Sequence, residues 1–162
     1  MTNDGVIILP DVSARVRSAF NVFYTTSPGM TLTIDDWETI PFNSEAVDLT
    51  GDFNSSTGVF TAPVSGIYAL SATVMLTLLE RAVVGLKIRI VTSNHSYEKT
   101  VPVVHYDAGS DPDHNMGLSL SIFCDMDTAD TAYVQIYQDG GTTEANVHPV
   151  YSWFSGGLRM RT

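Results

Sequence analysis

Three aspartates lie close together in the segment 105–115, which reads HYDAGSDPDHN: Asp107, Asp111 and Asp113. Calcium binds several oxygen ligands, and one flexible loop often supplies both the carboxylates and the carbonyls. Glycine and proline within the segment indicate a loop. The pattern therefore fits a calcium site formed by these three carboxylates. It also fits an acidic loop that is simply solvated, and both interpretations stay open.

No other group of residues has the spacing of a catalytic site. The four histidines are dispersed along the chain, and the sequence has no G-x-S-x-G, H-E-x-x-H, Walker A or G-x-G-x-x-G motif. We therefore expect a protein without enzymatic activity and, calcium aside, without a cofactor.

The composition argues for self-association. Hydrophobic residues make up 44% of the chain and charged residues 16%, less than the quarter that is usual in soluble domains. The net charge of −10 disfavours nucleic-acid binding, because the chain would repel phosphates. No apolar run is long enough for a membrane span, and no secretory signal is visible. Cys124 is the single cysteine, which excludes an intrachain disulfide and predicts a buried thiol.

The elements that must position these residues are β-strands. Residues 67–78 alternate strictly, which predicts a long strand. One face carries Tyr68, Leu70, Ala72, Val74, Leu76 and Leu78. The opposite face is also uncharged, so it fits a subunit interface or the second side of a crowded sheet.

Similar patterns predict about ten strands, at 18–24, 30–34, 37–42, 59–60, 67–78, 82–91, 97–104, 116–124, 132–138 and 152–160. No helical period is present, so we expect an all-β protein, an antiparallel jelly-roll β-sandwich. We divide the chain into an extended arm at 1–15 and one domain at 16–162. The apolar arm residues Val6, Ile7, Ile8 and Leu9 are predicted to dock on the same trimer or on a neighbour in an assembly, or to form an edge strand.

Several motifs resemble those of one family. The sequence has IPFN at 40–43, GDFN at 51–54, TGVFTAP at 57–63, GIY at 66–68 and WFSGGL at 153–158. Together they resemble the complement C1q globular-head family, which is structurally related to the tumour necrosis factor trimers. The likeness spans about residues 18–160, with departures at Leu70 and Gly157.

The resemblance implies a compact homotrimer whose exposed loops bind a ligand. It also implies that Asp107 and Asp113 correspond to calcium-binding aspartates found in some members of the family. For the trimer interface we select Tyr68, Met75, Tyr133 and Tyr137, because aromatic residues and methionine are enriched at such surfaces. A charged residue at Tyr68 is expected to dissociate the oligomer. Trp37 is the candidate for contact with a ligand, as a platform for sugar stacking.

Two functions are consistent with these expectations. The first is a surface component of a phage particle, either a capsid decoration protein or a fibre-head adhesin, located on the virion and bound to a capsid or tail. The second is a secreted C1q-domain protein that recognises carbohydrate, a protein receptor or a microbial surface. The lack of a visible signal sequence and of disulfides favours the particle component.

Overall fold

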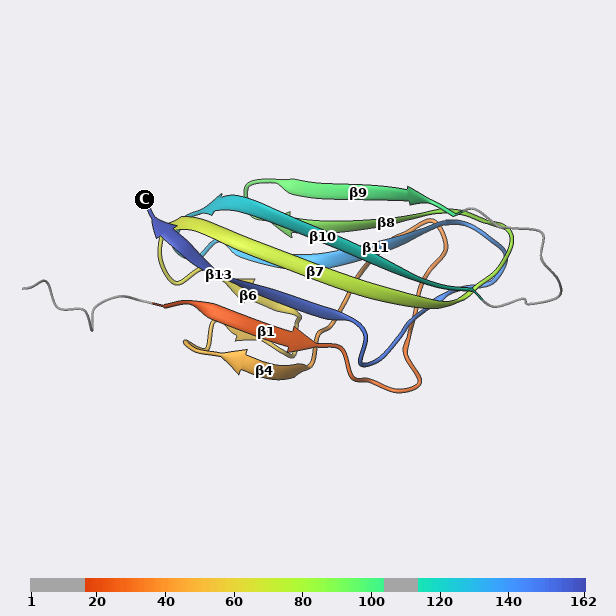
Figure 1. Ribbon diagram of the computed structural model, residues 1–162, viewed down its shortest axis with the longest axis horizontal. Helices are drawn as coiled ribbons and strands as arrows, with labels where there is room; N and C mark the ends of the chain where they lie inside the picture. Colours follow the sequence, from red (N-terminus) through yellow and green to blue (C-terminus); the bar gives the residue numbers. More distant parts are fainter. Residues whose placement is uncertain (1–16, 104–113) are drawn as a thin grey trace, which may run out of the picture.

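The computed structural model describes residues 17–103 and 114–162, and every regular element in these ranges is a β-strand (Figure 1). The strands are β1 (Ala19–Phe23), β2 (Met30–Thr31), β3 (Trp37–Thr39), β4 (Ser44–Asp48), β5 (Phe53–Asn54), β6 (Val59–Thr61), β7 (Gly66–Leu79), β8 (Val83–Thr92), β9 (Ser96–Pro102), β10 (His114–Met126), β11 (Thr131–Gly140), β12 (Asn146–Val147) and β13 (Trp153–Arg161). No helix in the described ranges is long and apolar enough to cross a membrane.

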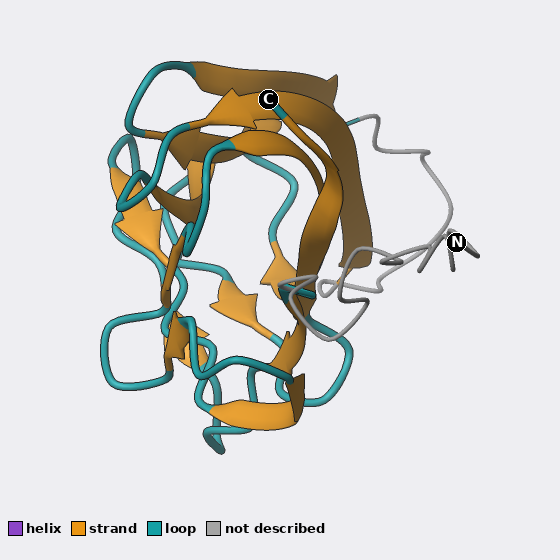
Figure 2. Cartoon of the chain, turned by 90° about the vertical axis from the view of Figure 1, so that its left-hand side faces the viewer, coloured by secondary structure: helices purple, strands orange, loops and turns teal. Residues whose placement is uncertain are grey.

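The strands form two sheets that enclose one core. Sheet A has the order β2-β12-β7-β13-β1-β4, with β10 paired to β7. Sheet B has the order β5-β6-β11-β8-β9, with β3 paired to β11. All pairs between named strands are antiparallel. Figure 2 shows the strands surrounding the interior of the sandwich. The predicted all-β jelly-roll sandwich is confirmed.

Strand β7 is the centre of sheet A. It pairs with β10 along one side and with β13 and β12 along the other, so it runs between β10 and β13 in Figure 1. Its side chains alternate between buried and half-buried from Gly66 to Thr77, as the sequence predicts. The alternation of buried and half-buried side chains then breaks at the end of the strand. Leu78 has a φ of 61° and is exposed, whereas Leu79 is buried, so the placement of Leu78 on the core face was wrong.

The core is built largely from aromatic rings where the two sheets meet. Phe20 stacks on Phe60 with ring centroids 4.6 Å apart and meets Phe154 edge-on at 4.9 Å. Tyr68 packs against Phe60 at 5.7 Å. These residues come from β1, β6, β7 and β13, so one cluster joins both sheets. Burial of each large side chain contributes about 1.5–3 kcal/mol.

Strand β8 differs from its predicted phase at its start. Val84 was expected to point inward, but 67% of its surface is exposed, and Val83 is buried in its place. The ladder between β8 and β11 has an irregularity between Asp139 and Gly140, opposite this point. Beyond it, Leu86, Ile88 and Ile90 are buried as predicted.

Candidate binding surfaces

The outward side of sheet A, which we call face A, is formed by β10, β7, β13 and β1. The pairing places side chains of these strands in rows across the sheet. One row consists only of small polar residues: Ser121, Ser71, Ser155 and Asn21. The next row is Ser119, Thr73, Trp153 and Phe23. Neither row contains a charged side chain.

The hydroxyl groups on face A bond to one another. Ser71 Oγ lies 2.7 Å from Ser121 Oγ, and Thr73 Oγ1 lies 2.9 Å from Ser119 Oγ. Each pair joins β7 to β10. Because these hydroxyls already have partners within the chain, covering them with another surface costs less free energy than burying unpaired hydroxyls.

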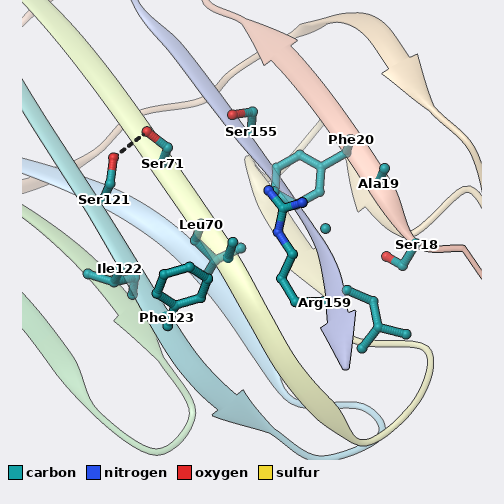
Figure 3. A pocket seen from close by; sticks show the side chains of 14 residues that line it. Ser18, Ala19, Phe20, Leu70, Ser71, Ser121, Ile122, Phe123, Ser155 and Arg159 are labelled. Carbon is teal, nitrogen blue, oxygen red and sulfur yellow. Dashed lines mark hydrogen bonds between the residues drawn. The ribbon is translucent and has the colours of Figure 1, made fainter. Parts of the chain in front are cut away.

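A hollow of about 510 Å³ lies on face A. Its floor includes Ala69 and Gly157, which face each other across β7 and β13. Phe123 from β10 and Arg159 from β13 both line it, and Arg159 lies between Phe123 and the β1 residue Ala19 (Figure 3). Phe123 is 71% exposed, the largest fraction among the exposed large hydrophobic side chains of the described residues. An exposed aromatic ring beside a hollow with a floor of small residues is suited to contact with another protein surface.

The two glycines of β13 are required by close packing. A Cβ atom at Gly156 would lie 2.4 Å from Leu70 Cδ2, inside the core. A Cβ atom at Gly157 would lie 2.9 Å from the Ser18 carbonyl oxygen of the neighbouring chain segment. Glycine at position 157 therefore lets Ser18, which precedes β1, lie close to β13. Because glycine has no side chain, it also adds no atoms that would fill the hollow.

The outward side of sheet B, which we call face B, carries a row of stacked cations and aromatic rings. Lys87 Nζ lies 4.4 Å from the centroid of the Tyr137 ring. The Tyr137 and Trp37 rings follow, with centroids 5.3 Å apart. The guanidinium carbon of Arg89 lies 3.9 Å from the Trp37 centroid at the other end. These contacts fasten the short strand β3 to β11 and β8.

Arg89 is held in place by a second set of contacts. Its Nε donates a 2.8 Å hydrogen bond to Gln135 Oε1, and its Nη2 donates to the same oxygen. Gln135 Nε2 in turn donates to Thr39 Oγ1 at 3.0 Å. The guanidinium is therefore oriented by an amide and an aromatic ring, both of them uncharged.

The residues selected for the trimer interface do not share one surface. Tyr68 is fully buried in the core, so its assignment to a subunit interface was wrong. Its hydroxyl donates a 2.8 Å hydrogen bond to the Val64 carbonyl, and burial raises its pKa. Met75 lies on face A, whereas Tyr133 and Tyr137 lie on face B. Strand phase separates inward from outward side chains but does not tell which sheet a strand joins.

Trp37 is half-buried on face B. Arg89 lies over its ring and Tyr137 packs against it, so its ring is already in contact with two neighbours. The structure therefore gives it a packing role that its position after Asp35-Asp36 did not indicate. Cys124 is 3% exposed, and burial raises its pKa to about 11, so the predicted buried thiol is confirmed.

Two predictions fall outside the described residues. The aspartates of the calcium hypothesis, Asp107, Asp111 and Asp113, lie in the segment 104–113, and the arm residues 6–9 lie in the segment 1–16. Both stay predictions. Within 17–103 and 114–162, no group of three histidine, cysteine, aspartate or glutamate side chains is arranged to hold a metal ion.

Sequence reasoning missed Phe123 and Arg89. Phe123 had a signal, because it stands in the outward phase of β10 among Ser119 and Ser121, where an aromatic residue is out of place on a solvated strand. No pattern in the sequence indicated the environment of Arg89. Its contacts with Trp37 and Gln135 depend on β3, β11 and β8 being neighbours, and the three residues are far apart in the chain.

Comparisons with known proteins agree with this architecture. A family model described as the C1q domain matches residues 19–158. The fold is similar to the globular domain of zebrafish complement 1qA, with a TM-score of 0.66, 18% identity, and coverage of 90% of this chain and 99% of that one. It is also similar to murine APRIL at pH 8.5, with a TM-score of 0.60, 7% identity, and coverage of 88% and 99%. No curated protein matches the sequence.

Proposed function

The chain belongs to the C1q domain family, and from that premise we propose that it is a homotrimeric recognition module whose subunits join through face A. Domains of the C1q and tumour necrosis factor type are binding modules without enzymatic activity, and they typically form homotrimers. The observation that carries the proposal is the exposed Phe123 beside a hollow on the same face.

The position of Phe123 suits a closed ring of subunits. Strand β10 is an edge of sheet A, whereas the floor of the hollow lies further in, on β7 and β13. Phe123 of one copy therefore enters the hollow of the next copy while its own hollow receives Phe123 of the third. Such head-to-tail contacts close when three copies are related by a threefold axis. Each buried phenyl ring contributes about 1.5–3 kcal/mol.

Charges at the border of face A support the same arrangement. Asp125 follows Phe123 by two residues on β10, and so lies on the same side of that strand. Arg159 is one of the residues that line the hollow (Figure 3). When Phe123 of one copy occupies the hollow of the next, Asp125 of the first approaches Arg159 of the second. Opposite charges placed in this way select the register of the contact.

The comparisons favour a recognition module over a particle component. They concern a complement protein and APRIL, and they give no support to a phage particle. In the proposed trimer, face B stays open to solvent and is the broad surface that remains for a ligand. A location on a virion or in the extracellular space stays a prediction.

The experiment that tests the proposal is light scattering of the purified full-length chain. We expect a mass of about 53 kDa, three times the 17.6 kDa of one chain. Phe123→Glu is expected to give a folded monomer, because it removes the ring that fills each hollow and requires three carboxylates to be desolvated in its place. Val84→Glu is the matched control, since Val84 is similarly exposed on β8 of sheet B, and it is expected to stay trimeric. A monomeric wild-type chain, or a trimeric Phe123→Glu variant, contradicts the proposal.

A charge exchange tests the register of the subunits. Arg159→Glu alone is expected to weaken the trimer, because the introduced carboxylate would face Asp125 of the neighbouring copy. The double variant Arg159→Glu with Asp125→Arg is expected to recover the trimer, as the attraction returns with reversed sign. The dissociation constants of the single and double variants, measured by sedimentation, show whether the second charge change restores the trimer. Equal and additive effects would place the two residues in separate environments.

A further inference from the structure

Arg89 on face B is fixed in position without an anionic partner. The Trp37 ring packs against its guanidinium, and Gln135 Oε1 accepts hydrogen bonds from its Nε and Nη2. No carboxylate of the described residues forms an ion pair with it. Glu98 is its register partner on β9, but the Arg89 side chain leans the other way, across β11 towards Trp37.

The overall charge makes this arrangement unusual. The chain has 18 acidic residues against 8 lysines and arginines, so carboxylates are abundant. Lys87, on the same face, does have such a partner, since its Nζ lies 3.8 Å from Asp139 Oδ2. An arginine that is oriented by uncharged groups has already lost much of its side-chain entropy and keeps N–H donors for an external acceptor.

The surroundings of Arg89 determine which groups of the protein a bound acceptor could contact. Strand β11 is paired on both sides at residues 135–137, with β3 and β8, so its backbone has no free edge for an added peptide strand. None of the main hollows of the described surface includes Arg89 or Trp37. A ligand here therefore contacts side chains only. The groups around Arg89 are the amide of Gln135, the hydroxyl of Thr39 and the phenol groups of Tyr133 and Tyr137 on the side of β11, and the carboxylate of Glu98 on the side of β9.

We propose that face B binds the carboxylate of an acidic saccharide at Arg89, with the neighbouring amide and hydroxyl groups contacting the sugar hydroxyls. The inference rests on the proposed function and gives the recognition module a ligand class. A carboxylate matches the planar guanidinium and forms charge-assisted hydrogen bonds, which are stronger than neutral ones. A uronate carries both this group and several hydroxyls on a small ring, so it fits a flat face of side-chain donors. Trp37 acts as a positioning residue, because it holds the guanidinium while its own ring stays covered.

The test is a titration of the full-length chain with D-glucuronate, followed by saturation-transfer NMR and by isothermal calorimetry. D-Glucose is the control for the sugar without a carboxylate, and a short glutamate-containing peptide is the control for a carboxylate without a sugar. We expect glucuronate to bind at least tenfold more tightly than either. Arg89→Gln is expected to weaken glucuronate binding by about ten- to hundredfold, the loss of one charge-assisted contact. Added salt should weaken binding as well.

Two variants control for charge and for folding. Lys99→Gln removes the same charge from β9, where Lys99 Nζ donates to the Ser119 carbonyl, and it should leave binding unchanged. Arg89→Lys keeps the charge but loses the planar fork, and should bind glucuronate with intermediate affinity. The thermal midpoint and the trimer mass are recorded for each variant, so a failure of this proposal is separated from a failure of the trimer.

Three patterns of binding would overturn the proposal, as would the absence of binding: equal binding of glucose and glucuronate, glucuronate binding that survives Arg89→Gln in a folded trimer, or preferential binding of the glutamate peptide. The last result would assign face B to acidic protein partners. A trimer that binds none of the three probes also rejects it while leaving the proposed assembly intact.

Discussion

The hydroxyl of Tyr68 donates a 2.8 Å hydrogen bond to the carbonyl of Val64, four residues earlier and within the same chain. The bond closes the turn that leads into β7 and satisfies the single polar atom of a ring that is otherwise surrounded by the core. Tyr68 therefore stabilises the protomer, while contact between copies is left to residues on the other side of β7.

Tyr68→Phe is expected to destabilise the fold by about 1 kcal/mol, because the Val64 carbonyl loses its donor. Urea denaturation at a fixed protein concentration measures this change. The trimer mass should not change. A folded but monomeric Tyr68→Phe variant would return Tyr68 to the subunit interface and contradict its position in the core.

Trp37→Ala is expected to lower the free energy of unfolding by about 1–2 kcal/mol. The variant removes the contact with Arg89 and the packing against Tyr137, which together hold the three-residue strand β3 on sheet B. The denaturation midpoint of the variant, compared with the wild type, checks the value. A change below about 0.5 kcal/mol would show that these stacked rings do not stabilise β3.

Glu80 is expected to make stability depend on pH. Its carboxylate accepts hydrogen bonds from the backbone N–H groups and hydroxyls of Thr142 and Thr143, and the backbone bonds are the main reason that its pKa lies below the ordinary value of 4.5. A lowered folded-state pKa stabilises the fold above the unfolded pKa, and this contribution disappears as the pH falls through the folded pKa.

The comparison of wild type with Glu80→Ala tests this effect. The wild type should have the higher thermal midpoint from pH 7 down to about 4.5, and the difference should shrink at lower pH. Glu80→Gln keeps the shape of the side chain, and should lie between the two at pH 7. A difference that is constant across the range, or that grows in acid, would contradict a role for the ionised carboxylate.

Cys124 should react slowly with thiol reagents in the folded protein. It is 3% exposed, and its pKa of about 11 leaves little thiolate at pH 8. Titration with a dithiobis-nitrobenzoate reagent should detect one thiol per chain only after denaturation in guanidinium. Rapid reaction of the native protein would show that β10 opens readily at this point.

The sequence predicts the phase of each long strand well, because a buried face requires alternation. Residues 67–77 and the inward residues of β11 have the burial that the pattern indicates. The pattern fails where the backbone changes, at Leu78 with its positive φ and at Val84 near the irregular pairing of β8 with β11. Neither residue differs in type from its buried neighbours, so the sequence contains no sign of the change.

The binding surfaces were harder to predict, because they depend on which strands are neighbours. Tyr133 and Met75 both point outward, yet they lie on opposite sheets. The hollow on face A depends on the register that places Ala69 beside Gly157 and Phe123. Residue type favours aromatic residues at an interface, but only the order of the strands decides which of them share a surface.

The central claim is that face A is the contact between subunits, and a crystal structure of the full-length chain tests it most directly through the exposed fraction of Phe123. In the isolated protomer this fraction is 71%. We expect it to fall below about 10% in a threefold assembly, with the ring of one copy over Ala69 and Gly157 of the next. Copies that join through face B, or a Phe123 side chain that stays in solvent, would contradict the account.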